Sequence, residues 1–133
     1  MKFNEFYSLT IVHSRDIILV KGVDYMNITK QKSQKTFDKQ AADYDTNIQG
    51  EHARKLYKPI IENLKNKNIH SILDLGCGTG ALLKEIKELN IAEQLFGIDI
   101  SPNMLEIAKN KLGNDATLIL GDSERLPFED SSF

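Results

Sequence analysis

The stretch SILDLGCGTGALLKEI, residues 71–86, decides the fold of this chain. It starts with an apolar run, passes through three alternate glycines and continues with apolar residues at helical spacing. An apolar run without polar alternation is typical of a strand that is buried on both faces, as in a parallel sheet. The stretch therefore predicts a strand over residues 69–75, a tight loop and a helix over residues 81–89, with Asp74 just before the loop.

A second unit of the same kind follows. Residues 95–100 form another apolar run, and Ser101-Pro102 predicts a helix start because serine is a favoured N-cap and proline suits the first helical position. Gly113 is placed to end this helix, and residues 116–120 predict a third strand. The alternation of strands and helices predicts a Rossmann-like parallel sheet in a three-layer α/β/α fold.

The residues before the first predicted strand have weaker patterns. FDKQAADYD, residues 37–45, has helical spacing, whereas residues 27–35 are polar and are predicted to be mobile. Residues 49–68 predict a longer helix, in which Pro59 is expected to cause a kink or to mark the true start.

Composition sets broad limits on the function. The 133 residues are 41% hydrophobic and 27% charged with a formal net charge of −2, which favours one globular domain and gives no sign of a nucleic-acid-binding surface. Cys77 is the single cysteine, so no intrachain disulfide is expected, and the three histidines lack metal-ligand spacing. The early apolar run of residues 17–20 is too short for a membrane span, and we expect a cytoplasmic protein.

An acid follows or ends each predicted strand: Asp74, Asp99 and Asp122. Ligands of parallel sheets bind at the carboxyl ends of the strands, so these acids are expected at the site. The glycines also fit the G-x-G-x-x-A pattern of dinucleotide-binding folds, which keeps an NAD-linked oxidoreductase as an alternative. However, like charges at ~4 Å and an effective dielectric near 20 cost about 4 kcal/mol, so Asp74 disfavours a pyrophosphate there and favours a cation. S-adenosylmethionine, which carries an ammonium and a sulfonium and no phosphate, meets this requirement.

Four segments, FDKQAADYD, ILDLGCGTG, LFGIDISPNML and GDSERLPFEDSSF, occur in this order from Phe37 to Phe133. Together they resemble the N-terminal half of class I S-adenosylmethionine-dependent methyltransferases, especially the branch similar to ubiquinone and menaquinone biosynthesis methyltransferases. The resemblance implies that Asp74 belongs to the motif that positions the methionine end of the cofactor. Gly76 and Gly78 match positions where the backbone approaches the cofactor, and Cys77 is a small residue in the same loop.

The resemblance also implies roles beyond the glycine loop. Asp99 matches the residue that holds the ribose, Ile100 and Met104 match positions that flank the adenine, and Asp122 with the backbone of Ser123 matches the contact to the adenine edge. Tyr44 matches an aromatic residue that covers the cofactor.

The implied reaction is in-line methyl transfer to a small-molecule acceptor, aligned by the protein without a dedicated catalytic residue or metal. The sequence names no acceptor. An alternative is a cofactor-binding half-domain without turnover. We divide the chain into an N-terminal extension (residues 1–26), an N-terminal helical cap (27–68) and the cofactor-binding half of a methyltransferase domain (69–133).

The two ends of the chain raise separate expectations. Codons permitted by residues 21–23 include a ribosome-binding sequence, which suggests translation from Met26; alternatively, the extension packs as an extra strand. At the other end, the resembled family continues past the position of Phe133 into a fourth strand beside the first. A chain truncated after the third strand would leave an unpaired edge at residues 72–75, so we expect a fragment of the full enzyme that self-associates through this edge.

Overall fold

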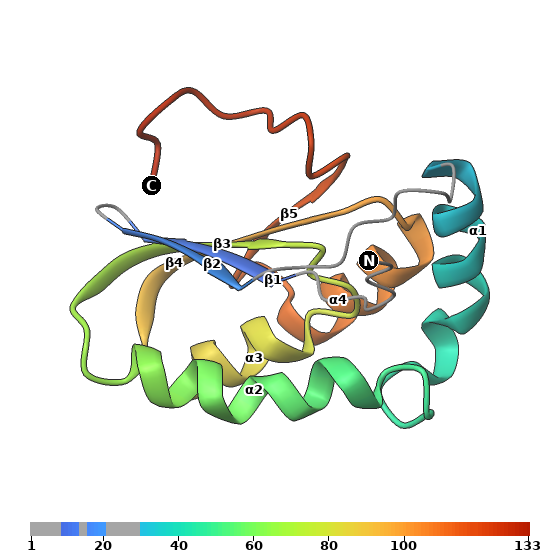
Figure 1. The fold of residues 1–133 in the computed structure, drawn as a ribbon, viewed down its shortest axis with the longest axis horizontal. Helices are drawn as coiled ribbons and strands as arrows, with labels where there is room; N and C mark the ends of the chain where they lie inside the picture. Colours follow the sequence, from blue (N-terminus) through green and yellow to red (C-terminus); the bar gives the residue numbers. More distant parts are fainter. Residues whose placement is uncertain (1–8, 14–15, 21–29) are drawn as a thin grey trace, which may run out of the picture.

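A computed structural model describes residues 9–13, 16–20 and 30–133 and shows a single five-stranded sheet (Figure 1). The strand order is β2-β1-β3-β4-β5. Strands β3 (Ile69–Leu75), β4 (Ala92–Asp99) and β5 (Thr117–Leu120) are parallel, which confirms the predicted Rossmann-like arrangement. Strands β1 (Leu9–His13) and β2 (Asp16–Val20) form an antiparallel pair at one edge.

Three helices provide the apolar layer on one side of the sheet: α2 (Glu51–Leu64), α3 (Ala81–Glu88) and α4 (Pro102–Leu112). Helix α1 (Lys30–Gln40) and the short 3-10 helix η1 (Ala41–Asp43) contact α4. Figure 1 shows α2 and α3 below the sheet and residues 121–133 looping above it. The core between helices and sheet consists of aliphatic side chains, which include Ile61, Leu64, Ile72, Leu83, Ile86 and Leu95.

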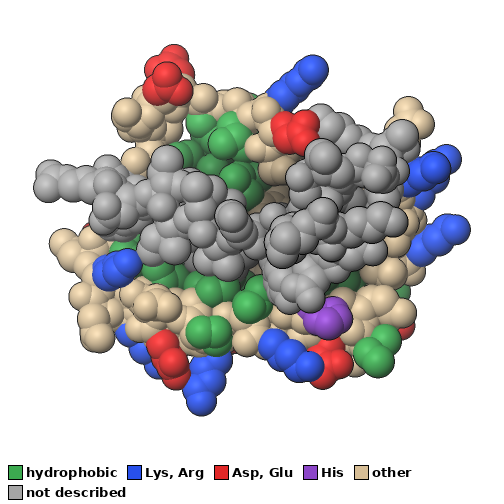
Figure 2. Space-filling model, viewed as in Figure 1, with side chains coloured by type: hydrophobic (Ala, Val, Ile, Leu, Met, Phe, Trp, Pro, Cys, Tyr) green, Lys and Arg blue, Asp and Glu red, His purple; other side chains and the backbone are tan. Residues whose placement is uncertain are grey.

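The C-terminal segment packs on the opposite face of the sheet. The ring of Phe96 lies 6.1 Å from that of Phe128 and 5.1 Å from that of Phe133, in edge-to-face geometry. The rings of Phe128 and Phe133 are themselves 4.9 Å apart. Figure 2 shows apolar side chains on this upper part of the molecule and mixed basic and acidic side chains around the rim of the same view.

Helix α4 begins and ends as predicted. The Ser101 hydroxyl accepts a hydrogen bond of 3.1 Å from the Met104 amide, and Pro102 is the first helical residue. Gly113 follows the helix with a φ of 55°, a conformation that favours glycine. Helix α2 begins at Glu51 and contains Pro59 in its interior, so this proline does not mark its start.

The prediction that residues 27–35 are mobile is wrong for the part that the structure describes. Helix α1 begins at Lys30, and its first half has no apolar stripe. Ser33 is 8% exposed, and the Thr36 hydroxyl donates a hydrogen bond of 2.8 Å to the Lys32 carbonyl. Because lysines dominate this helix, its sequence lacks the period that identifies an amphipathic helix.

The prediction of an unpaired strand edge at residues 72–75 is also wrong. Strand β1 pairs antiparallel with β3 through Ile11 opposite Asp74 and Val12 opposite Leu73. Strand β1 therefore covers this edge, and β2 pairs with β1. This agrees with the alternative prediction that the N-terminal extension packs as an extra strand. The suggested start at Met26 lies outside the described residues.

No helix in the described ranges is long and apolar enough to cross a membrane.

Shortening the chain to begin at Met26 should expose the edge of β3 and cause association that increases with protein concentration. Light scattering of the full and shortened chains checks this expectation. Val12→Pro in the full chain should have the same effect, because proline removes a backbone donor from the strand. A shortened chain that stays monomeric at all concentrations would contradict the role given to β1.

Candidate functional site

The glycine loop, residues 76–80, joins β3 to α3 and is bonded to the end of β4. The amides of Gly76 and Cys77 both donate to the carbonyl oxygen of Ile98, at 2.8 and 3.0 Å. The Gly78 amide donates to Oδ2 of Asp99 at 2.8 Å. Two strand ends and the loop between β3 and α3 are therefore held as one unit.

Asp74 is a buried acid without a complete set of partners. Its side chain is on the last part of β3 and is 1% exposed, and Oδ1 has no hydrogen-bond partner among the described residues. Burial, with a further contribution from the charge of Asp99, raises the pKa of Asp74 to about 8. A cationic or hydrogen-bond-donating ligand would supply the missing partner of this carboxyl.

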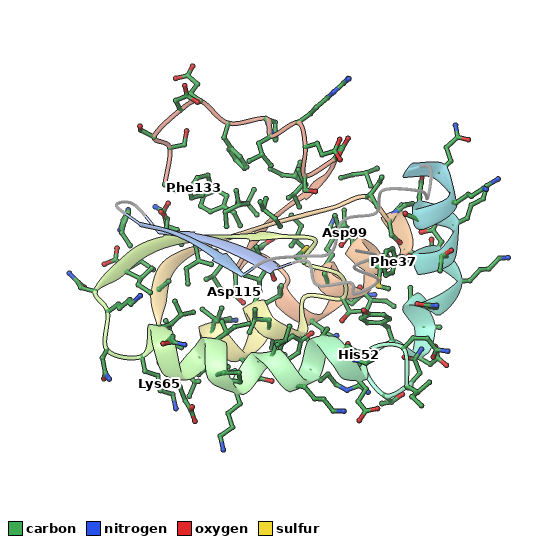
Figure 3. All side chains as sticks on the ribbon, viewed as in Figure 1. Phe37, His52, Lys65, Asp99, Asp115 and Phe133 are labelled. Atoms are coloured by element: carbon green, nitrogen blue, oxygen red, sulfur yellow. The ribbon has the colours of Figure 1, made fainter. Side chains whose placement is uncertain are left out.

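Asp99 ends β4 and organises the loop around itself. Besides the bond from Gly78, its Oδ1 accepts a hydrogen bond of 2.8 Å from the Ser101 amide. Burial raises the pKa of Asp99, although these backbone bonds oppose the shift. Each carboxylate oxygen can accept more than one hydrogen bond, so Asp99 retains capacity for a ligand hydroxyl. Figure 3 shows Asp99 at the same side of the molecule as Phe37 of α1, with Lys65 at the opposite side.

All three glycines of the loop have positive φ, and two of them differ in their surroundings. Gly78 has a φ of 52°, and a Cβ added there would meet no atom of the described residues within 4 Å. Gly80 has a φ of 72°, and a Cβ there would lie 2.9 Å from Cδ1 of Leu112 and 3.0 Å from Cβ of Ala108. Gly80 therefore allows α4 to pack closely, whereas Gly78 borders open space that a ligand can enter.

The predicted adenine-contact residues lie near the end of β4, with different degrees of exposure. The Gly121 amide donates to the Asp99 carbonyl at 2.9 Å, which brings the following residues beside this strand end. Asp122 is half-buried, and its Oδ1 accepts a bond of 3.0 Å from the Glu124 amide. The other three predicted residues differ in burial: Ile100 is half-buried, Ser123 is exposed and Met104 is 1% exposed.

Tyr44 comes from the segment after η1 and reaches the same region. Burial and the nearby charge of Asp99 raise the pKa of its phenol. Its ring contacts Phe37 edge-to-face at a centroid distance of 6.3 Å. Arg54 of α2 holds the Tyr44 carbonyl with a bond of 2.7 Å from Nη1.

Sequence reasoning missed Tyr57 of α2. Burial and then the charge of Asp74 raise the pKa of its phenol, so Tyr57 is electrostatically close to the buried acid. Its spacing from Ile61 and Leu64 was the available signal, because these three residues share one helix face. Sequence reasoning also missed Asp45 and Thr79, whose side chains bond to each other.

The Cys77 thiol is free and buried. Burial raises its pKa, which disfavours the thiolate form. Among the residues that the structure describes, no group of three or more potential metal ligands comes together.

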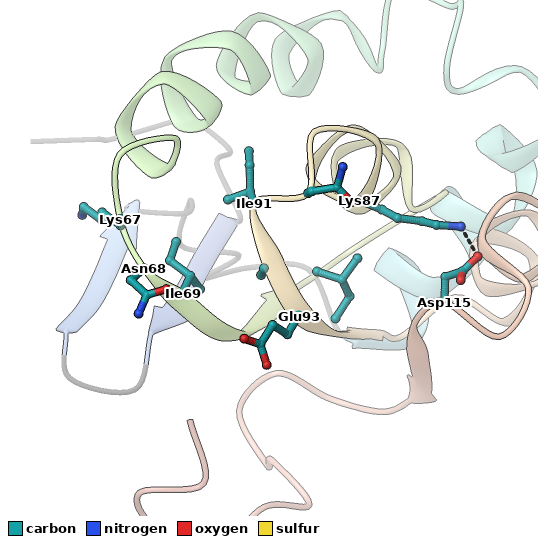
Figure 4. A pocket seen from close by; sticks show the side chains of 10 residues that line it. Lys67, Asn68, Ile69, Lys87, Ile91, Glu93 and Asp115 are labelled. Atoms are coloured by element: carbon teal, nitrogen blue, oxygen red, sulfur yellow. Dashed lines mark hydrogen bonds and ion pairs between the residues drawn. The ribbon is translucent and has the colours of Figure 1, made fainter.

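A cavity of about 480 Å³ lies away from the glycine loop, at the amino ends of β3 and β4 (Figure 4). Its lining includes Ile69 and Ala92, the first residues of these strands, and the Lys87–Asp115 ion pair. Parallel sheets bind ligands at the carboxyl ends of their strands, so we assign the site to the glycine loop and not to this cavity.

Comparisons with known proteins identify what the chain is similar to. Residues 72–133 match the family described as a methyltransferase domain. The chain is 34% identical over 108 residues to the demethylmenaquinone methyltransferase of Thermotoga maritima, covering 79% of this chain and 47% of that protein. It is 35% identical over 105 residues to the malonyl-[acyl-carrier protein] O-methyltransferase of Priestia megaterium, covering 77% and 38%. The chain thus spans less than half the length of these curated relatives.

Solved structures share the fold. The putative methyltransferase in complex with the Haloferax volcanii Trm112 methyltransferase activator superimposes with a TM-score of 0.56 and 28% identity, over 71% of this chain and 42% of that chain. The structure of the DhpI–SAH complex gives a TM-score of 0.57 at 19% identity, over 69% and 44%. Residues 72–133 of this chain therefore match a methyltransferase domain, and the chain is similar to class I S-adenosylmethionine-dependent methyltransferases over this part of its length.

Proposed function

We propose that this chain binds S-adenosylmethionine at the glycine loop, as part of an enzyme that transfers the methyl group to a small-molecule acceptor. The observation that carries the proposal is the buried carboxyl of Asp74, whose Oδ1 lacks a partner among the described residues. The open space over Gly78 lies in the same loop region and supports it. In this proposal residues 69–133 are the cofactor-binding half, and residues 27–68 are the helical cap.

The electrostatics of the site support a cation over a dinucleotide. Asp74 and Asp99 are both buried; the charge of Asp99 adds to burial in raising the pKa of Asp74, and the two acids add to burial in raising the pKa of the Cys77 thiol. A pyrophosphate would add two like charges to this region, whereas an ammonium would relieve the repulsion between the acids. An NAD-linked oxidoreductase is therefore the less favoured alternative.

When bound, S-adenosylmethionine supplies a methyl group made electrophilic by its sulfonium. The proposed roles of the protein are binding and orientation: Asp74 faces the ammonium, Asp99 accepts from the ribose hydroxyls, and Tyr44 covers the cofactor. Gly76 and Gly78 let the loop backbone approach the cofactor, and Cys77 is the small residue between them. Ile100 and Met104 flank the adenine, and Asp122 with the backbone of Ser123 contacts its edge. We assign no nucleophile and no general base to the described residues.

The acceptor is not assigned, and the relatives explain why. Proteins named for demethylmenaquinone, for malonyl-[acyl-carrier protein] and for a sterol all match this chain over 89 to 108 residues. Their named acceptors are chemically different, so the shared region is the one that handles the common cofactor. Because the chain spans less than half of these relatives, a cofactor-binding half-domain without turnover is the second candidate. A cytoplasmic location also stays a prediction.

Calorimetric titration with S-adenosylhomocysteine, with NADH as the control ligand, tests the proposal. We expect saturable binding of S-adenosylhomocysteine alone. Asp74→Asn keeps the shape of the side chain but cannot ionise to pair with an ammonium, and it should weaken this binding by about 1.5–3 kcal/mol, roughly 10- to 150-fold. Asp115→Asn, at the far end of the strands, is the matched control and should leave affinity unchanged. Tighter binding by Asp74→Asn, or binding of NADH, would contradict the proposal.

The ligand-free protein should lose stability as the pH rises from about 4 to about 8. The folded Asp74 carboxyl keeps its proton up to about pH 8, while the unfolded carboxyl loses it near 3.8, so the folded state binds more protons between these values. The free energy of unfolding then falls by up to about 1.4 kcal/mol per pH unit for this group. Denaturant unfolding at several pH values should show a shallower decline for Asp74→Asn. Identical slopes in both proteins would argue against a protonated Asp74.

Gly78→Ala and Gly80→Ala form a matched pair, because both place a side chain at positive φ. Each should lose about 1–2 kcal/mol of stability from backbone strain. Gly80→Ala should lose about 1–3 kcal/mol more, because its methyl group collides with Leu112 and Ala108 of α4. Gly78→Ala should instead lose affinity for S-adenosylhomocysteine, since its methyl group enters the ligand space. Thermal unfolding and calorimetry together separate the two effects, and equal affinity in Gly78→Ala and the wild type would place the ligand elsewhere.

A further inference from the structure

Two aspartates fasten the α1–η1 segment, residues 30–48, along helix α4. Asp38 Oδ1 accepts hydrogen bonds from the Ser101 hydroxyl at 2.5 Å and from the Asn103 amide at 3.3 Å, at the start of α4. Near the end of α4, Lys111 forms an ion pair with Asp45. Asp45 also accepts a hydrogen bond of 2.5 Å from the Thr79 hydroxyl. Asp45 therefore joins the segment both to α4 and to the glycine loop.

The bonds of Asp45 are partly shielded from water. The Thr79 residue is 2% exposed, and the side chains of Lys111 and Asp45 are 22% and 37% exposed. Burial acts to raise the pKa of Asp45, but the bonds from Lys111 and Thr79 outweigh it and hold the pKa below its usual value. Charge-assisted bonds of this kind are stronger than bonds between neutral groups.

Thr79 is the side chain through which the glycine loop contacts this segment. Its neighbours Gly78 and Gly80 have their amides bonded to Asp99 and to the Cys77 carbonyl, at 2.8 and 2.9 Å. The loop backbone is thus held from the β4 side, and the Thr79 hydroxyl is directed to Asp45. A shift of Asp45 would therefore be transmitted to the loop.

Tyr44 precedes Asp45 directly and extends the same connection. Its phenol is close enough to Asp99 for the charge of that acid to raise its pKa, after the larger effect of burial. Arg54 restrains the backbone here, with bonds of 2.7 Å to the Tyr44 carbonyl and 2.5 Å to the Asn47 carbonyl. Tyr44 and Asp45 thus connect this segment to Asp99 and to the glycine loop, respectively.

We propose that Asp45 is a positioning residue for cofactor binding: by bonding to Thr79 and Lys111 together, it holds the glycine loop and the α1–η1 segment in one arrangement. The inference rests on the proposed function, because the site that it shapes is the proposed site for S-adenosylmethionine. Asp45 acts through Thr79, and the proposal includes no direct contact between Asp45 and the ligand.

The first test measures amide hydrogen exchange in the ligand-free full chain. Asp45→Asn should increase exchange by about fivefold or more at residues 41–48 and also at residues 76–80, since local opening of both segments becomes easier. Asp115→Asn removes the charge of the Lys87–Asp115 ion pair, which lies away from the loop, and should leave both segments unchanged. Unchanged exchange at residues 76–80 in Asp45→Asn would overturn the proposal.

The second test titrates the same proteins with S-adenosylhomocysteine. Asp45→Asn and Thr79→Val should each weaken binding about fivefold or more, while Thr79→Ser, which keeps the hydroxyl, should bind within twofold of the wild type. Lys111→Met should resemble Asp45→Asn. Equal losses in Thr79→Ser and Thr79→Val, or wild-type affinity in Asp45→Asn, would overturn the role of Asp45.

The two tests separate this inference from the proposed function. If the wild type binds no S-adenosylhomocysteine, the proposed function fails, and the exchange comparison alone then decides whether Asp45 couples the segment to the loop. If the wild type binds and Asp45→Asn changes neither affinity nor exchange, the proposed function stands and the inference fails.

Discussion

The hydrogen bond from the Gly78 amide to the Asp99 carboxylate is the interaction on which the site depends. It joins the loop that follows one parallel strand to the end of the next strand. The bond to Asp99 from Ser101 extends the same connection into the start of α4. One carboxylate therefore positions a loop, a strand end and a helix start, and the proposed cofactor site lies where these three parts are held together.

The second acid, Asp74, has the opposite character. Its Oδ1 accepts no hydrogen bond from the described residues, and burial disfavours the charged form of its carboxyl. Retaining such a group costs stability in the ligand-free protein, and sites for charged ligands commonly contain groups of this kind. In the proposed function, the contrast between the hydrogen-bonded Asp99 and the Oδ1 atom of Asp74 distinguishes the acid that positions the loop from the acid that pairs with a ligand cation.

The parts of the structure that were predictable are those with local signals. Strand β3 and the start of α4 follow from an apolar run and from the Ser101-Pro102 pair, where each signal lies within a few residues of its effect. The bond between Asp45 and Thr79 spans 34 residues, and no local pattern indicates it. The pairing of β1 with β3 likewise depends on contacts between distant segments, so the sequence around β3 wrongly predicts an unpaired edge. The sequence predicts helical spacing only from Phe37, whereas α1 begins at Lys30, because the lysine-rich first half of this helix has no apolar period.

The antiparallel partner of β3 comes from a part of the chain that precedes it by about sixty residues. During synthesis the ribosome releases β1 before β3, whereas the parallel partner β4 is released afterwards. When β3 emerges, the strand that pairs with its edge away from β4 has already been synthesised. The central strand of the sheet can thus acquire its first neighbour while the rest of the chain is still being translated, which shortens the period in which its backbone is open to pairing with other nascent chains.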